Sequence, residues 1–232
     1  MSFKAKTIYV IVTTLFLVAF AIPLVGLAQK GEFEEFLGRV NQKLSSIETL
    51  SASFVQVRET NVAGQKMEAG GKLFLDKPRK VLLDYERPER QKFLVNGSNV
   101  TVYVPSLNQV QKYGLSGKLE SDQLFVFWEP LSKLQENFSM TQVRQKGTRL
   151  RYVELVPKDK TMWEGLKRIT LGIDPNLLLP TFIDVEEAGG DRVKMTLSNV
   201  KTNPKLDSSV FTLKLPAGVE VIDFSKGEDA PN

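Results

Sequence analysis

Few residues of this sequence are arranged as catalytic or metal-binding groups usually are. The chain contains neither histidine nor cysteine, so it lacks the commonest general base and the two commonest zinc ligands. Glu186 and Glu187 are adjacent, but neighbours on a strand project to opposite faces of a sheet and cannot act as one carboxylate pair. No acidic residues follow the spacing of a calcium-binding loop. We therefore predict no enzymatic activity, no metal and no cofactor.

Phosphate and nucleic-acid binding are not indicated either. The segment Gly114-Leu115-Ser116-Gly117-Lys118 contains a Gly-Lys pair, but it lacks the spacing and the strand-to-helix setting of a phosphate-binding loop. The chain has 31 basic and 27 acidic residues, and Lys4 and Lys6 lie in a segment that we expect to be removed. The remaining chain is then close to neutral, so charge gives no reason to expect a nucleic-acid partner.

The first 28 residues have the features of an export signal. Lys4 and Lys6 form a short basic start, and an uncharged, mostly apolar run follows. Pro23 interrupts this run, and small residues then lead to a cleavage position after Ala28. The alternative is an uncleaved anchor, because the run approaches the ~20 residues that span a bilayer. In both cases the rest of the chain is expected outside the cytoplasm.

Residues 29–232 are long enough for one domain with a substantial core. Without cysteine, this domain must be stable without disulfides. Its first element is predicted to be an amphipathic helix, because apolar residues recur there at helical spacing. These residues are Phe33, Phe36, Leu37, Val40, Leu44 and Ile47.

Nearly all of the remaining chain is predicted to form strands separated by turn residues. The predicted strands are Ser51–Glu59, Lys66–Leu75, Lys80–Tyr85, Gln91–Asn96, Asn99–Val104, Gln109–Tyr113, Phe138–Gln145, Leu150–Val156, Leu166–Ile173, Thr181–Glu187, Arg192–Val200 and Phe211–Leu215. Asn96-Gly97, Asp174-Pro175-Asn176 and Gly189-Gly190-Asp191 are predicted to be tight turns. Successive hairpins of this kind predict an antiparallel meander.

Alternation along the strands predicts one apolar and one polar face. Val100, Val102 and Val104, for example, alternate with more polar residues. A sheet of about a dozen strands tends to curl or split rather than stay flat. We expect the first helix and a shorter one near the middle to cover its concave face. The dense apolar segment 124–131 is predicted to form this short helix and a lid, although ordinary core packing is an equally good interpretation.

Several segments, in order along the chain, resemble the LolA family of periplasmic carriers of outer-membrane lipoproteins. The resemblance lies in five motifs: Ser53-Phe54-Val55-Gln56, Gly71-Lys72-Leu73-Phe74-Leu75-Asp76-Lys77-Pro78, Tyr85-Glu86-Arg87-Pro88, Asn96-Gly97-Ser98-Asn99-Val100-Thr101-Val102-Tyr103, and Phe211-Thr212-Leu213-Lys214-Leu215-Pro216-Ala217-Gly218-Val219-Glu220-Val221. Each motif is short, but they occur in order between Ser53 and Val221 and so extend along most of the mature chain.

The resemblance implies an unclosed antiparallel β half-barrel with a helical lid over a hydrophobic cavity. It also implies a monomeric periplasmic chaperone that takes lipoproteins from an inner-membrane lipoprotein-releasing ABC transporter to an outer-membrane acceptor. The better-known members of the family have arginine at the position of Lys77, where it bonds to the lid and helps to keep it shut. Lysine has the same charge without the planar fork of donors, so we expect Lys77 to form a different or weaker latch.

On this basis we predict that a set of apolar residues lines the acyl-chain cavity. They are Leu37, Val40, Leu73, Leu75, Val81, Leu83, Val100, Val102, Leu124, Phe125, Trp128, Leu131 and Met195. Each could instead be a core contact that never meets a ligand. Family members often have aromatic residues in place of Thr101 and near Leu83, so the cavity is expected to differ in shape.

Three other functions fit parts of the sequence. The first is a carrier of free phospholipid or another acylated molecule on the same fold, and the sequence does not separate it from a lipoprotein carrier. The second is a module that senses mislocalised lipoproteins, although such proteins usually carry a second domain. The third is a structural envelope protein, which would need a filled core without a ligand-sized void.

Overall fold

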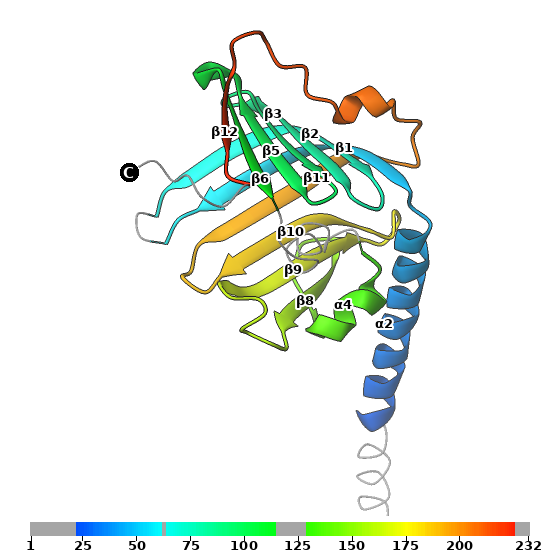
Figure 1. Ribbon diagram of the computed structural model, residues 1–232. Coiled ribbons are helices and arrows are strands. Elements are labelled where there is room, and N and C mark those ends of the chain that lie inside the picture. Colours follow the sequence, from blue (N-terminus) through cyan, green and yellow to red (C-terminus); the bar gives the residue numbers. More distant parts are fainter. Residues whose placement is uncertain (1–21, 62–63, 115–128, 226–232) are drawn as a thin grey trace, which may run out of the picture. The chain divides into compact units, whose positions relative to one another are not determined.

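The computed structural model describes residues 22–61, 64–114 and 129–225, with side chains from residue 31 onwards (Figure 1). The chain divides into two compact units, Met1–Val40 and Asn41–Asn232. Helix α2, Ile22–Ser45, begins in the first unit and ends in the second. It confirms the helix predicted from the apolar spacing and also passes through the predicted cleavage position. Within the described ranges, no helix is both long and apolar enough to cross a membrane.

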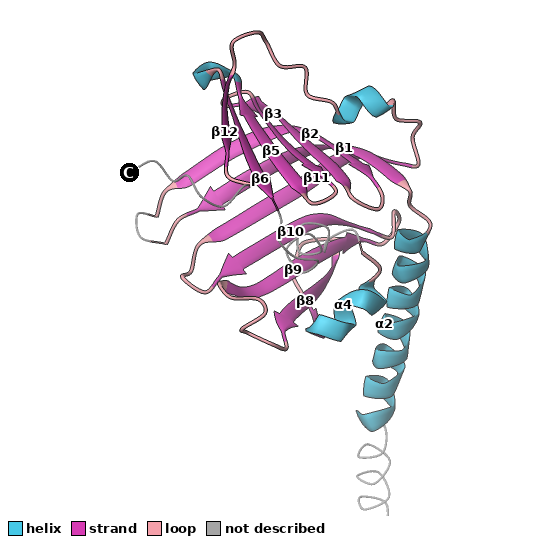
Figure 2. Ribbon diagram, viewed as in Figure 1, coloured by secondary structure: helices cyan, strands magenta, loops and turns pink. Residues whose placement is uncertain are grey.

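The second unit is built on one sheet of twelve strands (Figure 2). The strands are β1 Thr49–Glu59, β2 Lys66–Asp76, β3 Lys80–Arg87, β4 Gln91–Asn96, β5 Asn99–Val104, β6 Gln109–Gly114, β7 Phe138–Val143, β8 Arg151–Pro157, β9 Leu166–Asp174, β10 Leu179–Glu187, β11 Arg192–Thr202 and β12 Glu220–Asp223. Eleven of the twelve predicted strands are confirmed, with ends that differ by a few residues at most.

The order of the strands is β12-β6-β5-β4-β3-β2-β1-β11-β10-β9-β8-β7. The sheet is curved and unclosed, because β12 and β7 lie at its two ends and do not pair with each other (Figure 1). Two meanders, β1–β6 and β7–β11, meet where β1 pairs antiparallel with β11. The pairing brings together strands that are more than 130 residues apart, and hairpin signals alone did not predict it.

The predicted strand Phe211–Leu215 is wrong. A short 3-10 helix, η3, occupies Ser208–Phe211, and the Asp207 side chain accepts a hydrogen bond from the Ser209 N–H at its start. The twelfth strand is instead β12, which pairs parallel with β6 and so departs from a purely antiparallel meander. Val210, Phe211 and Leu213 instead pack on one face of the sheet, against Leu82 and Leu94.

The predicted tight turns are confirmed. Only two residues separate β4 from β5, and Gly97 has a φ of 64°, which glycine adopts without the steric cost that a Cβ would add. The turns between β9 and β10 and between β10 and β11 also lie where Asp174-Pro175-Asn176 and Gly189-Gly190-Asp191 predict them.

The sheet has two faces, and one of them, called the outer face, is polar along β8–β11. Ion pairs connect neighbouring strands on this face. Arg168 contacts both Glu154 and Glu186, which come from the neighbouring strands. Arg192 pairs with the buried Asp184 of β10. Glu186 therefore joins β10 to β9.

Helix α4, Leu131–Asn137, leads directly into β7. Leu131 and Leu134 of α4 are buried. Lys158, after β8, donates its backbone N–H to the Asn137 carbonyl and its Nζ to the Gln135 carbonyl, at 2.9 and 2.6 Å. The segment predicted to form the short helix, 124–131, overlaps α4 only at Leu131; residues 129 and 130 are not helical, and residues 124–128 lie outside the described part.

Candidate functional site

The strand register places a continuous row of apolar side chains on one face of the sheet. Residues directly opposite each other on paired strands project to the same side. From β1 to β5, one such row consists of Ala52, Leu73, Leu83, Phe93 and Val102. A second row beside it consists of Leu50, Leu75, Val81, Val95 and Val100. We call this the inner face.

The inner face continues across the β1–β11 junction to the other half of the sheet. There a row of opposed residues comprises Met195, Ile183, Leu171 and Val153. Phe54 of β1 lies opposite Leu197 of β11 and joins the two halves. An apolar surface that spans the curved sheet can cover a long hydrocarbon chain.

Burial divides the predicted cavity residues into two sets. Leu73, Leu75, Val81, Val100 and Leu131 are buried, with at most 6% of the residue exposed. Leu83, Val102 and Met195 share the inner face with the first four, but they are only partly buried. The partly buried residues are the ones that a ligand can reach without displacing the core.

The other predicted cavity residues lie elsewhere. Leu37 and Val40 are on the part of α2 that belongs to the first unit, and both side chains are buried. Leu124, Phe125 and Trp128 lie outside the described residues. Their predicted role in the cavity therefore stays a prediction.

Some residues of the inner face were not among the predicted ones. Phe93 and Val185 are partly buried and apolar, and they lie on the face shared by Leu83 and Met195. The period-2 pattern within their strands already placed them on one side. The strand register was needed to show that the apolar sides of different strands lie on the same face of the sheet.

An aromatic pair lies on the inner face over a glycine. Phe54 and Tyr85 make an edge-to-face contact with ring centroids 5.0 Å apart, and Gly71 lies opposite both residues on the strand between them. Burial raises the pKa of the Tyr85 hydroxyl, which donates a hydrogen bond to Gln56 Oε1 at 2.8 Å.

Lys77 lies in the turn between β2 and β3 and contacts the last turn of α2. Its Nζ donates a hydrogen bond to the Leu44 carbonyl at 2.9 Å, and its backbone N–H donates to the Glu48 carbonyl at 2.8 Å. The last carbonyls of a helix lack full intrahelical partners and carry partial negative charge, so they favour a cation. Lys77 therefore joins the end of α2 to the sheet.

Burial lowers the pKa of Lys77, and the charges of Glu129 and Glu48 oppose this change. A second contact of the same helix end involves α4. Asn41 Oδ1 accepts hydrogen bonds from the Ser132 N–H and Oγ–H at 3.2 and 3.1 Å. Lys133 beside it forms an ion pair with Glu129 at 2.8 Å. The C-terminal part of α2 is therefore held by polar contacts to the β2–β3 turn and to α4.

A separate groove of about 380 Å³ lies on the outer face, between residues 209–214 and strands β2–β5. It is lined by Phe74, Leu82 and Tyr103, among others. Tyr103 faces away from Val102, as alternation predicts, so this groove is distinct from the inner face. In the described part of the chain, His, Cys, Asp and Glu side chains form no group of three that could hold a metal ion.

Comparison with protein families gives one match over most of the second unit. Residues 45–214 match the model of the family described as outer membrane lipoprotein carrier protein LolA. This range contains the inner-face strands, Lys77 and α4. It covers well over half of the chain.

Individual relatives agree with this match. The chain is 28% identical over 187 residues to the outer-membrane lipoprotein carrier protein of Methylococcus capsulatus, covering 80% of this chain and 86% of that protein. It is 29% identical over 193 residues to the protein of the same name from Azotobacter vinelandii, covering 82% and 88%. Among solved structures, an uncharacterized conserved protein from Thermus thermophilus has a TM-score of 0.50 at 14% identity, covering 83% of this chain and 99% of that one.

Proposed function

Because the chain belongs to the LolA family of outer membrane lipoprotein carrier proteins, we propose that it is a periplasmic carrier that shelters the acyl chains of lipoproteins. The observation that carries the proposal is the apolar inner face, which crosses the unclosed sheet from Val102 to Val153. Relatives that span most of the chain are named as lipoprotein carriers, which supports this cargo.

The energetics of the cargo explain why such a face is needed. Each methylene removed from water contributes about 0.8 kcal/mol, so acyl chains are strongly held back from an aqueous compartment. Partly buried residues such as Leu83 and Met195 can exchange contacts with neighbouring side chains for contacts with an acyl chain. An apolar face that other side chains already partly cover gains less free energy on binding an acyl chain than a fully exposed face would. This smaller gain favours release of the cargo.

Transport requires a donor and an acceptor. We propose that the donor is an inner-membrane ABC transporter that releases lipoproteins, and that an outer-membrane acceptor receives the cargo. The carrier acts as a monomer and performs no catalysis. Its mature form begins at Gln29, after removal of residues 1–28.

The cargo can be identified by native mass spectrometry and lipid extraction of the protein recovered from the periplasm of its own cells. We expect acylated lipoprotein bound at one equivalent. If only free phospholipid is recovered, the cargo is a free lipid and not a lipoprotein. Protein that carries no lipid and does not enhance the fluorescence of a hydrophobic dye would contradict both.

Lys77 is proposed to act as a latch, and replacing it with methionine should speed cargo release. The substitution keeps most of the aliphatic stem but removes the bond to the Leu44 carbonyl. A hydrogen bond from a charged group contributes about 1.5–3 kcal/mol, and burial of the charge offsets part of it, so we expect roughly 5- to 10-fold faster release. Lys77→Arg, with more donors, should slow release.

The measurement is stopped-flow displacement of a fluorescent acylated peptide. Lys80→Met is the matched control, because Lys80 follows the same turn but bonds to Asp76 and not to the helix. Equal release rates for Lys77→Met and Lys80→Met would show that Lys77 is not a latch.

A further inference from the structure

The inner face changes from apolar to polar on strand β6. Gln109 and Gln111 lie opposite Val104 and Val102 of β5, and Tyr113 follows them in the same alternation. These three β6 residues therefore project to the inner face, as the valines do. A line of polar groups borders the apolar rows near one edge of the sheet, and the sheltering of acyl chains alone gives this line no part.

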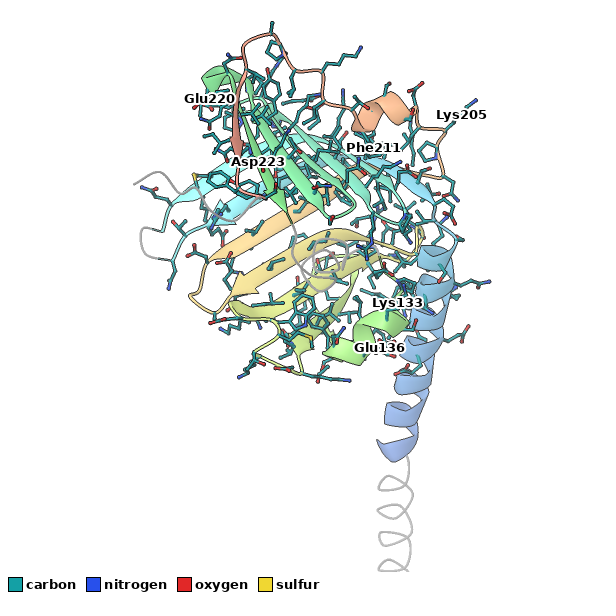
Figure 3. All side chains as sticks on the ribbon, in the orientation of Figure 1. Lys133, Glu136, Lys205, Phe211, Glu220 and Asp223 are labelled. Carbon is teal, nitrogen blue, oxygen red and sulfur yellow. The ribbon has the colours of Figure 1, made fainter. Side chains whose placement is uncertain are left out.

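Four side chains at this edge form one line of hydrogen bonds, which we call the amide ladder. The Tyr113 hydroxyl donates to Gln111 Oε1 at 2.8 Å, and Gln111 Nε2 donates to Gln109 Oε1 at 2.9 Å. Gln109 Nε2 then donates to Glu220 Oε2 at 3.2 Å. Glu220 begins β12, the last strand at this end of the sheet, and Asp223 ends it (Figure 3). The ladder therefore fixes the orientation of both glutamine amides.

The two glutamines of the ladder keep part of their hydrogen-bonding capacity. A primary amide has two N–H groups, and its oxygen can accept two hydrogen bonds. Within the described ranges, the side chains of Gln109 and Gln111 each donate one hydrogen bond and accept one. Each therefore keeps one donor and one acceptor position. Residues two apart on a strand are separated by about 6.6 Å, and an extended peptide repeats its backbone groups at the same spacing.

An exposed aromatic pair lies at the end of the ladder. Phe224 follows β12, and its ring stacks on the ring of Tyr113 with the centroids 5.1 Å apart. Tyr113 is 37% exposed and Phe224 is 44% exposed. The Phe224 N–H donates to the Lys112 carbonyl at 2.8 Å, which holds its backbone against β6. Two stacked rings that remain open to water give a flat apolar surface on which a ligand can pack.

We propose that the amide ladder and the Tyr113–Phe224 pair bind the polypeptide of the cargo, next to the acyl chains on the inner face. This inference rests on the proposed carrier function and adds which part of the cargo this edge binds. A polypeptide supplies N–H donors and C=O acceptors in a regular repeat, which matches the free positions of the two amides. A free lipid has no such repeat, so it uses the apolar rows without the ladder. The ladder thus favours a lipoprotein over a free lipid.

The test compares two probes that carry the same acyl chain. One is a palmitoylated peptide of glycine and serine, and the other is palmitamide, which lacks the peptide. Their affinities are measured by displacement of a hydrophobic dye from the protein. Gln111→Leu removes the central amide of the ladder, so it should weaken binding of the peptide probe about five- to ten-fold. Binding of palmitamide should change by less than about two-fold, because leucine keeps the face apolar.

Gln142→Leu is the matched control, because it makes the same substitution at the other end of the sheet. Gln142 of β7 is exposed and lies opposite Val153, so it also projects to the inner face. This variant should leave the affinities for both probes within about two-fold of those of the unsubstituted protein. Thermal unfolding checks that each variant is folded.

The outcomes separate this inference from the carrier function on which it rests. If Gln111→Leu weakens binding of both probes equally or of neither, or if Gln142→Leu weakens the peptide probe as much, the ladder does not bind the polypeptide. The carrier function stands in each of these cases, because the unsubstituted protein still binds an acylated probe. If the unsubstituted protein binds neither probe, the carrier function itself is contradicted, and the inference with it.

Discussion

Replacing Val102 with glutamate is expected to weaken cargo binding by at least about 100-fold, which corresponds to roughly 3 kcal/mol. Val102 is partly buried on the inner face, between Phe93 of β4 and Gln111 of β6. A carboxylate there would have to lose water when an acyl chain binds, and no cation on this row would compensate. The loss can be measured by titration with a fluorescent acylated peptide.

The matched control is Thr101→Glu, on the next residue of the same strand. Thr101 is also partly buried but projects to the outer face, opposite Lys112 of β6. The same charge is therefore added at nearly the same place along the chain, beside a lysine and away from the inner face. We expect its cargo affinity to stay within about three-fold of the unsubstituted protein, as for most surface changes.

A second variant separates loss of binding from loss of folding. Val102→Trp keeps the face apolar but fills space that an acyl chain would occupy, so it should also weaken binding while retaining the far-ultraviolet circular dichroism of the sheet. If Val102→Glu and Thr101→Glu bind cargo equally well, the inner face is not the acyl-chain surface.

Gly71→Ala is expected to destabilise the protein by about 3 kcal/mol or more, near or above the upper end of the usual cost of overpacking. A Cβ at Gly71 would lie 1.9 Å from the Asp84 carbonyl oxygen, and also within 3 Å of the Asp84 carbon and Tyr85 Cα. All three obstacles are backbone atoms, so no side chain can move aside. The irregular register between β2 and β3 at Gly70 and Gly71 brings the strands together at this point.

Urea unfolding measures this effect, and Gly189→Ala provides the comparison. A Cβ at Gly189 would meet no atom within 4 Å, so the same substitution should change stability by less than about 0.5 kcal/mol. Equal unfolding midpoints for the two variants would refute the close approach of β3 to Gly71. The clash also predicts that Gly71→Ala disturbs the Phe54–Tyr85 contact, which near-ultraviolet circular dichroism would detect.

Many features of the fold could be predicted because they depend on neighbours in sequence. Alternation places Val100 and Val102 on one side of β5 and Tyr103 on the other, since successive side chains on a strand point in opposite directions. Gly97 indicates its turn because the left-handed conformation costs glycine little. The apolar spacing of the first helix and eleven of the strands followed from the same kind of local rule.

Other features required contacts between distant residues. Phe211 and Leu213 alternate as a strand would, but they pack on Leu82 and Leu94 from outside the sheet. The Asp207 side chain caps η3, and aspartate is a residue type that favours this position, but the predicted strand did not take it into account. Apolar residues with this spacing can either pack on a face of a sheet or form one of its strands. Which of the two occurs depends on the distant segment that is available to contact them.

The sequence by itself determined that this chain forms an antiparallel β protein with one apolar face, and it carried the family motifs. The tertiary structure decided that β1 pairs with β11, that Lys77 bonds to the Leu44 carbonyl, and that Val102 stays partly exposed whereas Val100 is buried. Side-chain direction along a strand follows from the backbone geometry of adjacent residues. Burial and strand pairing depend instead on which distant segments meet, and their free energies are shared among many residues, so no local pattern encodes them.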